Sequence, residues 1–116
     1  MSTLPPRVTP KNYLMAWLLV MLKGGNLHGY EIFKHLRERF AVTADAGTVY
    51  RALRQLEAEG YISSWWDPKM QGPARRLYTL TPAGDEALAR WCSALSEYRR
   101  GLDAFFGLYE GTPQRR

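Results

Sequence analysis

The segment from Asp45 to Gly60 constrains the fold most, because it carries the end signals and both faces of one amphipathic helix. Asp45 can cap the start of a helix, and Gly60 can end it. One face is apolar, and its residues are Val49, Ala52, Leu53 and Leu56. The opposite face is small and basic, and its residues are Gly47, Thr48, Arg51 and Arg54. The segment therefore predicts a helix that is buried on one side and open to a partner on the other.

The order of charges along this segment indicates what that partner is. Arg51 and Arg54 come early and Glu57 and Glu59 late, whereas the helix macrodipole favours acids first and bases last by roughly 0.3–1 kcal/mol each. In a DNA recognition helix, cations in the N-terminal half are favourable, because that half faces base edges and phosphates. The alternative is an ordinary surface helix with an Arg54/Glu57 pair three residues apart.

Size and charge narrow the class of protein. A chain of 116 residues is long enough for one domain with an appendage. Its 16 Lys and Arg against 11 Asp and Glu give a net charge of +5, which favours nucleic acid or an anionic membrane surface as partner. If the partner is DNA, the protein is expected in the cytoplasm, associated with the nucleoid.

Cysteine and histidine are too scarce for several kinds of site. Cys92 is the only cysteine, so no disulfide can form within the chain, and nothing suggests a secreted scaffold. Together with His28 and His35 it makes too few and too scattered ligands for structural zinc, so we expect no metal and no cofactor. We expect Cys92 to be a buried or half-buried helix residue rather than a redox switch.

The first expected helix runs from Pro10 to Lys23, because Thr9 can cap it and Pro10 suits the first helical position. Residues 1–9 lack apolar periodicity and are expected to form a flexible arm. The apolar run 13–22 is about half of the roughly 20 residues that span a bilayer, and no signal-cleavage motif follows it. We therefore expect a buried helix that contacts more than one layer and no association with membranes.

A second helix is expected from about His28 to Phe40, after a break at residues 24–26. Its inward positions are Ile32, Phe33, Leu36 and Phe40. Only a short turn separates it from the helix that starts after Asp45. Two helices joined in this way, the second with a basic outer face, predict a helix-turn-helix.

Two β-prone runs, 61–66 and 76–80, predict a hairpin directly after the basic helix. Their connection contains Lys69 and Arg75 and is longer than the 2–5 residues that a hairpin turn needs. Such a hairpin is expected to act as a wing that touches DNA beside the recognition helix. The alternative is a loop whose cations only keep the protein in solution.

The last expected helix begins at Pro82, with Thr81 as its cap. Apolar residues follow in steps of three and four, the pattern of a coiled-coil seam, at Leu88, Trp91, Leu95, Tyr98, Leu102, Phe105 and Tyr109. The seam predicts pairing with a second copy; the alternative is that it packs only on its own domain. Gly101 and Gly107 each cost about 1 kcal/mol inside a helix, so we expect its far end to kink or fray.

The predicted fold is mainly α with a small β-hairpin. It comprises the arm (residues 1–9), a winged helix-turn-helix DNA-binding domain (10–80), a C-terminal dimerisation helix (81–110) and a free tail (111–116). Four motifs within it occur in a characteristic order: Leu27-His28-Gly29-Tyr30-Glu31-Ile32, Gly47-Thr48-Val49-Tyr50, Leu53-x-x-Leu56-Glu57-x-x-Gly60 and Tyr78-x-Leu80-Thr81-x-x-Gly84. Over residues 10–95 this set resembles the PadR family of bacterial transcriptional regulators, in its short subfamily.

The resemblance implies a homodimeric winged-helix regulator that represses a neighbouring operon until an effector arrives, and it implies no enzymatic activity. Transferred by position and supplemented by nearby cations, the expected DNA contacts are Tyr30, Lys34, Thr48, Tyr50, Arg51, Arg54, Lys69, Arg75 and Arg76. Many relatives have Pro where this chain has Arg51, so the operator preference of the family does not transfer.

Residues 10–36 and the version of the third-helix motif in residues 48–53 are also similar to a branch described as polyhydroxybutyrate-responsive repressors. That branch implies a storage polyester or its granule surface as effector. We expect an effector to bind where the final helices meet the core, at Trp17, Trp91, Leu95 and Tyr98. For Trp91 the alternative is simple packing in the seam.

The two alternatives to DNA binding are an adaptor and an enzyme. An adaptor could bind protein or a granule through Trp65, Trp66 and the aromatic last helix without reading a DNA sequence. An enzyme would need a Gly-rich phosphate loop, a metal set, or a nucleophile with a nearby base, and the sequence shows none of these at a recognisable spacing.

Overall fold

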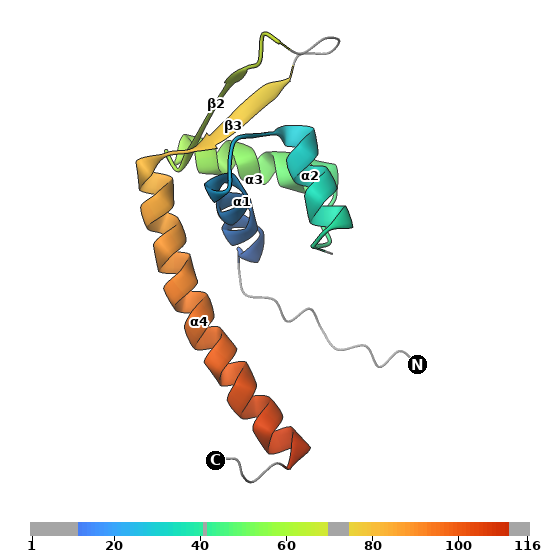
Figure 1. The fold of residues 1–116 in the computed structure, drawn as a ribbon, viewed down its shortest axis with the longest axis vertical. Helices are drawn as coiled ribbons and strands as arrows, with labels where there is room; N and C mark the ends of the chain where they lie inside the picture. Colours follow the sequence, from blue (N-terminus) through green and yellow to red (C-terminus); the bar gives the residue numbers. More distant parts are fainter. Residues whose placement is uncertain (1–11, 41, 70–74, 112–116) are drawn as a thin grey trace.

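The computed structural model describes residues 12–40, 42–69 and 75–111 (Figure 1). Within these ranges the elements are α1 (Tyr13–Lys23), β1 (Leu27–His28), α2 (Gly29–Glu38), α3 (Ala46–Ala58), β2 (Ile62–Trp66), β3 (Arg76–Leu80) and α4 (Pro82–Glu110). The predicted fold class, mainly helical with a small β-sheet and a long C-terminal helix, is confirmed. The predicted arm and the tail beyond residue 111 lie outside the described residues.

Helix α1 lies at the centre of the core and contacts α3, β3 and α4, as its apolar character on several sides predicted. Leu18, Leu19 and Leu22 are buried there. The helix begins at Tyr13, after Asn12, whose φ of 61° lies in the left-handed region, and the predicted start at Pro10 lies outside the described residues. In the described ranges no helix combines the length and apolarity needed to cross a membrane.

Helices α2 and α3 form the predicted helix-turn-helix. Asp45 caps α3 as expected, because its Oδ1 accepts a hydrogen bond of 2.7 Å from the backbone N–H of Thr48. Val49, Leu53 and the other apolar positions of α3 are buried. Phe40 is an exception to the predicted inward face of the second helix, because α2 ends at Glu38 and leaves the ring 39% exposed against Trp17.

The predicted hairpin is present, with β2 antiparallel to β3 in a register that pairs Ile62 with Leu80 and Trp66 with Arg76. The structure adds a third strand that the sequence did not reveal: β1 pairs with β3 on the other side, in the order β1-β3-β2. Two residues are too few for any periodic pattern to mark a strand. This short strand places the start of α2 beside the part of β3 that is nearer the loop of the wing.

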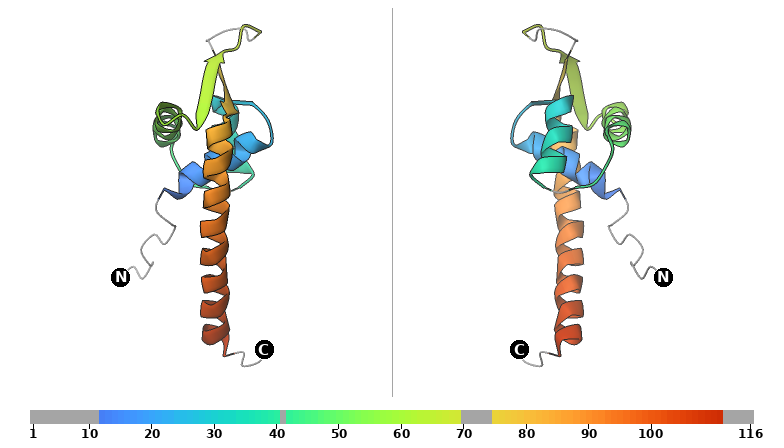
Figure 2. Two further views of the ribbon diagram at one scale, coloured as in Figure 1. Left: turned by 90° about the vertical axis from the view of Figure 1, so that its left-hand side faces the viewer. Right: turned by 90° about the vertical axis from the view of Figure 1, so that its right-hand side faces the viewer.

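Helix α4 begins as predicted, with Pro82 in its first turn and the Thr81 hydroxyl accepting from the backbone N–H of Gly84 at 3.0 Å. It continues through Gly101 and Gly107 to Glu110, so the expected kink or fraying at its far end is wrong. Its first turns pack on α1, and the remainder extends away from the domain (Figure 2). The radius of gyration is therefore 17.5 Å, against about 13 Å for a compact chain of this length.

Gly84 is the point of closest approach between α4 and the start of β2. The Tyr61 carbonyl accepts the backbone N–H of Thr81 at 3.1 Å, and a Cβ on Gly84 would lie 1.9 Å from that carbonyl oxygen. Only a residue without a side chain fits there. Close packing against the Tyr61 carbonyl therefore explains the glycine that ends the fourth sequence motif.

We expect Gly84→Ala to lower the free energy of unfolding by about 1–3 kcal/mol, because the added methyl group meets backbone that cannot yield without moving α4. Gly101→Ala is the matched control in the same helix, where a Cβ would meet nothing within 4 Å. It should be neutral or stabilise by up to about 1 kcal/mol through helix propensity. Chemical denaturation of both variants measures the difference, and equal stability would contradict the packing argument.

Candidate nucleic-acid interface

The outward face of α3 carries the first group of predicted DNA contacts. Arg51 and Arg54 are exposed, and Thr48 is half-buried. The Arg51 guanidinium donates to the Thr48 hydroxyl at 3.2 Å, one turn back along the helix. The backbone N–H of Thr48 also lowers the pKa of the capping Asp45. The start of α3 thus presents the exposed Arg51 cation beside the half-buried Thr48 hydroxyl on its outward face.

A groove of about 510 Å³ lies between α2, α3 and the wing. Its lining residues are Gly29, Tyr30, Tyr50, Arg54, Glu57, Trp66, Arg75, Arg76 and Tyr78. Five of the nine predicted DNA contacts are therefore in one groove. Thr48 and Arg51 lie on α3 outside its lining, and Lys34 on α2 and Lys69 after β2 are exposed away from it.

Tyr50 joins the two helices of the helix-turn-helix. A Cβ on Gly29 would lie 2.7 Å from the Tyr50 ring, so the start of α2 approaches α3 too closely for any side chain. Tyr50 is half-buried as a result. Of the two tyrosines predicted to touch DNA, Tyr30 is the more exposed, at 43%.

A polar network that the sequence did not reveal attaches the wing to α3. The Ser64 hydroxyl on β2 lies 2.9 and 3.0 Å from the two carboxylate oxygens of Glu57, and it accepts from Nε of Arg76 at 2.9 Å. The guanidinium of Arg76 also lies 4.8 Å above the Trp66 ring. Arg76 therefore helps to hold the wing against α3, in addition to its predicted role as a DNA contact.

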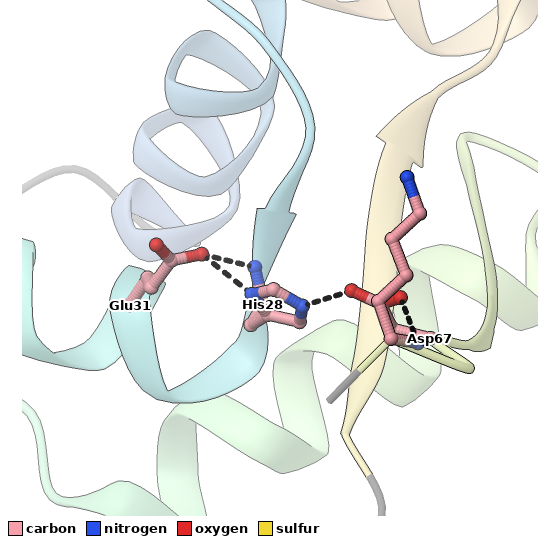
Figure 3. A network of polar contacts seen from close by, with 4 residues as sticks. His28, Glu31 and Asp67 are labelled. Atoms are coloured by element: carbon pink, nitrogen blue, oxygen red, sulfur yellow. Dashed lines mark hydrogen bonds and ion pairs between the residues drawn. The ribbon is translucent and has the colours of Figure 1, made fainter. Parts of the chain in front are cut away.

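A second network attaches the wing to α2 (Figure 3). The two ring nitrogens of His28 face carboxylates on opposite sides: Nδ1 lies 2.9 Å from Glu31 and Nε2 lies 2.8 Å from Asp67. Glu31 also accepts the backbone N–H of His28 at 2.7 Å, and Asp67 accepts that of Lys69 at 3.0 Å. His28 and Glu31 stand in one sequence motif, but their pairing with Asp67 spans 39 residues and left no signal in the sequence.

The charges in this network shift the pKa values of its members. The hydrogen bond with Asp67 is the largest cause that raises the pKa of His28 above 6.5. The backbone N–H of Lys69 and the His28 ring lower the pKa of Asp67. The imidazolium and the carboxylate therefore stabilise each other.

An apolar pocket of about 150 Å³ lies between α1 and α4. Trp17, Trp91 and Leu95 of the predicted effector set line it, and Tyr98 does not. Cys92 lies at this pocket and is exposed, so the prediction of a buried or half-buried Cys92 is wrong: the domain does not extend over that side of α4.

The predicted dimerisation seam is covered at the start of α4 and exposed over the rest of the helix. Leu88 is buried and Trp91 and Leu95 are half-buried, whereas Tyr98 is 42%, Leu102 38%, Phe105 58% and Tyr109 80% exposed. The domain therefore covers only the first turns of the seam.

A helix-turn-helix with an attached wing defines this chain as a winged-helix protein, and no group of three or more metal-ligating side chains is found in the described part of it. The family model of the PadR-like transcriptional regulators matches residues 18–90. The chain belongs to this family, which is a family of regulators and not of enzymes. The resemblance seen in the sequence motifs is thereby confirmed at the level of the family.

Individual relatives agree with this assignment. Transcriptional regulator Rv3488 of Mycobacterium tuberculosis is 38% identical over 74 residues, which are 64% of this chain and 67% of the relative. A PadR family regulator from Clostridium difficile is 28% identical with a TM-score of 0.73, over 83% of this chain and all of that one. PadR of Bacillus subtilis, solved with operator DNA, is 28% identical with a TM-score of 0.66, over 72% of this chain and 48% of that one.

Proposed function

We propose that this protein is a sequence-specific DNA-binding regulator, acting in the cytoplasm on the nucleoid, that represses transcription as a homodimer on a pseudo-palindromic operator until an effector binds. The observation that carries the proposal is the groove that unites Tyr30, Tyr50 and Arg54 of the helix-turn-helix with Arg75 and Arg76 of the wing. Bacillus subtilis PadR, which shares this fold, is solved bound to operator DNA. A net charge of +5 suits the same partner.

In this function the start of α3 enters the major groove and the wing follows the adjacent backbone. Arg51, presented with Thr48 on the outward face of α3, is the candidate for reading a base, and Lys69 and Arg75 are candidates for phosphates. The adaptor alternative relies on exposed Trp65 and Trp66. Trp66 already lies beneath the Arg76 guanidinium, which favours a wing built to present cations.

The homodimer is supported by the exposed half of α4. Aromatic and aliphatic side chains are exposed in a row along this half, and contiguous exposed apolar surface of this kind marks interaction sites. A second copy of the same helix is complementary to a heptad seam. The two-fold dimer then requires two half-sites about one DNA turn, or a multiple, apart.

The effector site is proposed at the pocket between α1 and α4. Its volume of about 150 Å³ is below the roughly 300–1,000 Å³ of small-molecule sites, so two such pockets joined across the dimer would be needed. Trp17, Trp91 and Leu95, with Tyr98 nearby on the seam, suit a flat aromatic compound or an ester-rich segment such as polyhydroxybutyrate. The ligand would act by favouring a spacing of the two α3 helices that does not match successive major grooves.

Operator recognition is tested with a duplex that the full chain selects from a random pool. We expect affinity to fall steeply with salt, because several cations replace counterions on phosphates. Arg51→Ala should cost about 1–3 kcal/mol on the selected duplex and much less on random DNA, whereas the exposed Lys69→Ala should weaken both alike. Fluorescence anisotropy measures the loss of affinity of each variant on each duplex, relative to the wild type. If the chain selects no sequence from the pool, the adaptor function is favoured.

Dimerisation is tested by two charge substitutions on opposite faces of α4. Leu102→Glu places a carboxylate in the seam and should convert the protein to a monomer at micromolar concentration, because a buried unpaired charge costs several kcal/mol. Ala104→Glu, two residues on and about 200° around the helix, should leave the dimer intact. Sedimentation velocity distinguishes the two, and a monomeric wild-type chain would refute the dimer itself.

The effector site is tested in a variant that keeps Trp91 and has Phe at the other three tryptophans, provided that it binds the selected duplex like the wild type. Hydrophobic aromatic compounds and hydroxybutyrate oligomers are titrated while Trp91 emission and DNA affinity are recorded. We expect the compound that releases DNA to shift the emission, and Trp91→Ala to abolish that release. Release with unchanged emission would place the effector elsewhere.

A further inference from the structure

The side chains of His28 and Asp67 connect two elements that are proposed to contact DNA, the helix-turn-helix and the wing. His28 ends β1 and leads into α2, and Asp67 follows β2, where the connection to β3 begins (Figure 3). We propose that His28 is a positioning residue that holds the wing and α2 in their DNA-binding arrangement only while it is protonated, so that DNA affinity falls as pH rises. This inference rests on the proposed function and adds to it a sensitivity to pH.

The geometry of the contact is that of a charged ring between two carboxylates. The Nε2–Asp67 and Nδ1–Glu31 distances are 2.8 and 2.9 Å, and the side chains of His28 and Asp67 are only 13% and 15% exposed. An imidazolium donates at both nitrogens, and a neutral imidazole at one. Loss of the proton therefore leaves one of the two carboxylates facing a lone pair in a site with little water.

The same ring supports two of the predicted DNA contacts. Tyr30 stacks on His28 with ring centroids 5.8 Å apart and an angle of 18° between the planes. The guanidinium of Arg75 lies 5.1 Å above the Tyr30 ring. His28 thus underlies a stack that ends in a cation of the wing.

Glu31 on α2 and Asp67 after β2 place negative charge against the ring. The positive charges are Lys69, which acts on Asp67, and Arg75, which lies beyond the Tyr30 ring. The hydrogen bonds with the two carboxylates, that with Asp67 first, raise the pKa of His28. Because the folded protein binds this proton more tightly than the unfolded chain, the stabilisation is fully present below about pH 6.5 and is lost as pH rises through the pKa of His28. Asp67, with its lowered pKa, stays ionised throughout this interval.

The first measurement is made on the free protein. The backbone N–H of Asp67 donates to the carbonyl of Arg75 at 2.8 Å and extends the pairing of β2 and β3 toward the loop of the wing. We expect the protection factor of this amide against hydrogen exchange to fall as His28 loses its proton, with both followed by NMR. Asp67→Asn keeps an acceptor for the Lys69 amide. In this variant the pKa of His28 should drop, and the pH at which the protection of the residue-67 amide changes should fall with it. Protection that is independent of pH would overturn the proposal.

The second measurement is the affinity of the full chain for the selected duplex and for a random duplex of equal length, at constant ionic strength between about pH 6 and pH 9. Wild-type affinity should fall on the order of three- to tenfold as pH rises, because the fraction of molecules in the DNA-binding arrangement falls by the same factor. Asp67→Asn should bind more weakly at the acid end and change less than about twofold over the range.

His35→Gln, which removes the other histidine, should retain the wild-type dependence on pH. A flat wild-type profile, or an Asp67→Asn profile with the wild-type slope, would refute the positioning role while leaving DNA binding established. If the wild type bound neither duplex at any pH, the proposed function would fail. The protection of the Asp67 amide would then still decide whether His28 controls the wing.

Discussion

The burial of α1 on three sides is the interaction on which the rest of the structure depends. Leu18, Leu19 and Leu22 are almost completely removed from water, and each contributes about 1.5–3 kcal/mol. Because α3, β3 and α4 all pack on this helix, α1 sets where the recognition helix, the wing strand and the C-terminal helix lie relative to one another. A ligand between α1 and α4 would therefore press on the element that also supports α3, through one continuous set of packed side chains.

Ile62 and Tyr78 anchor the wing strands in the core, and polar contacts hold the part of the wing nearer its loop. An isolated two-stranded hairpin is marginal in water, and β1 extends the sheet by only two residues. Ser64 and Glu57 join the wing to α3 on one side, and His28 and Asp67 join it to α2 on the other. Side-chain hydrogen bonds of this kind depend on charge, so the position of the wing can respond to conditions that leave the apolar core unchanged.

Much of the fold could be predicted from the sequence, because its signals are local. Asp45 and Thr81 cap helices by bonding residues three positions on, and the apolar spacing of α3 and α4 repeats within one or two turns. The wing hairpin follows from two β-prone runs with a polar connection. Cys92 and Phe40 were misjudged, because their exposure depends on how far neighbouring elements extend.

The sequence by itself thus determined the order of the helices and of the wing hairpin, the family, and which residues face outward from α3, but not strand β1. Only the tertiary structure decided which of those residues share a groove, that Gly29 and Gly84 are points of contact, and that His28 meets Asp67. Caps and periodicity are properties of neighbouring residues along the chain. A hydrogen bond between residues 39 positions apart depends on how the elements pack, and no local pattern records that.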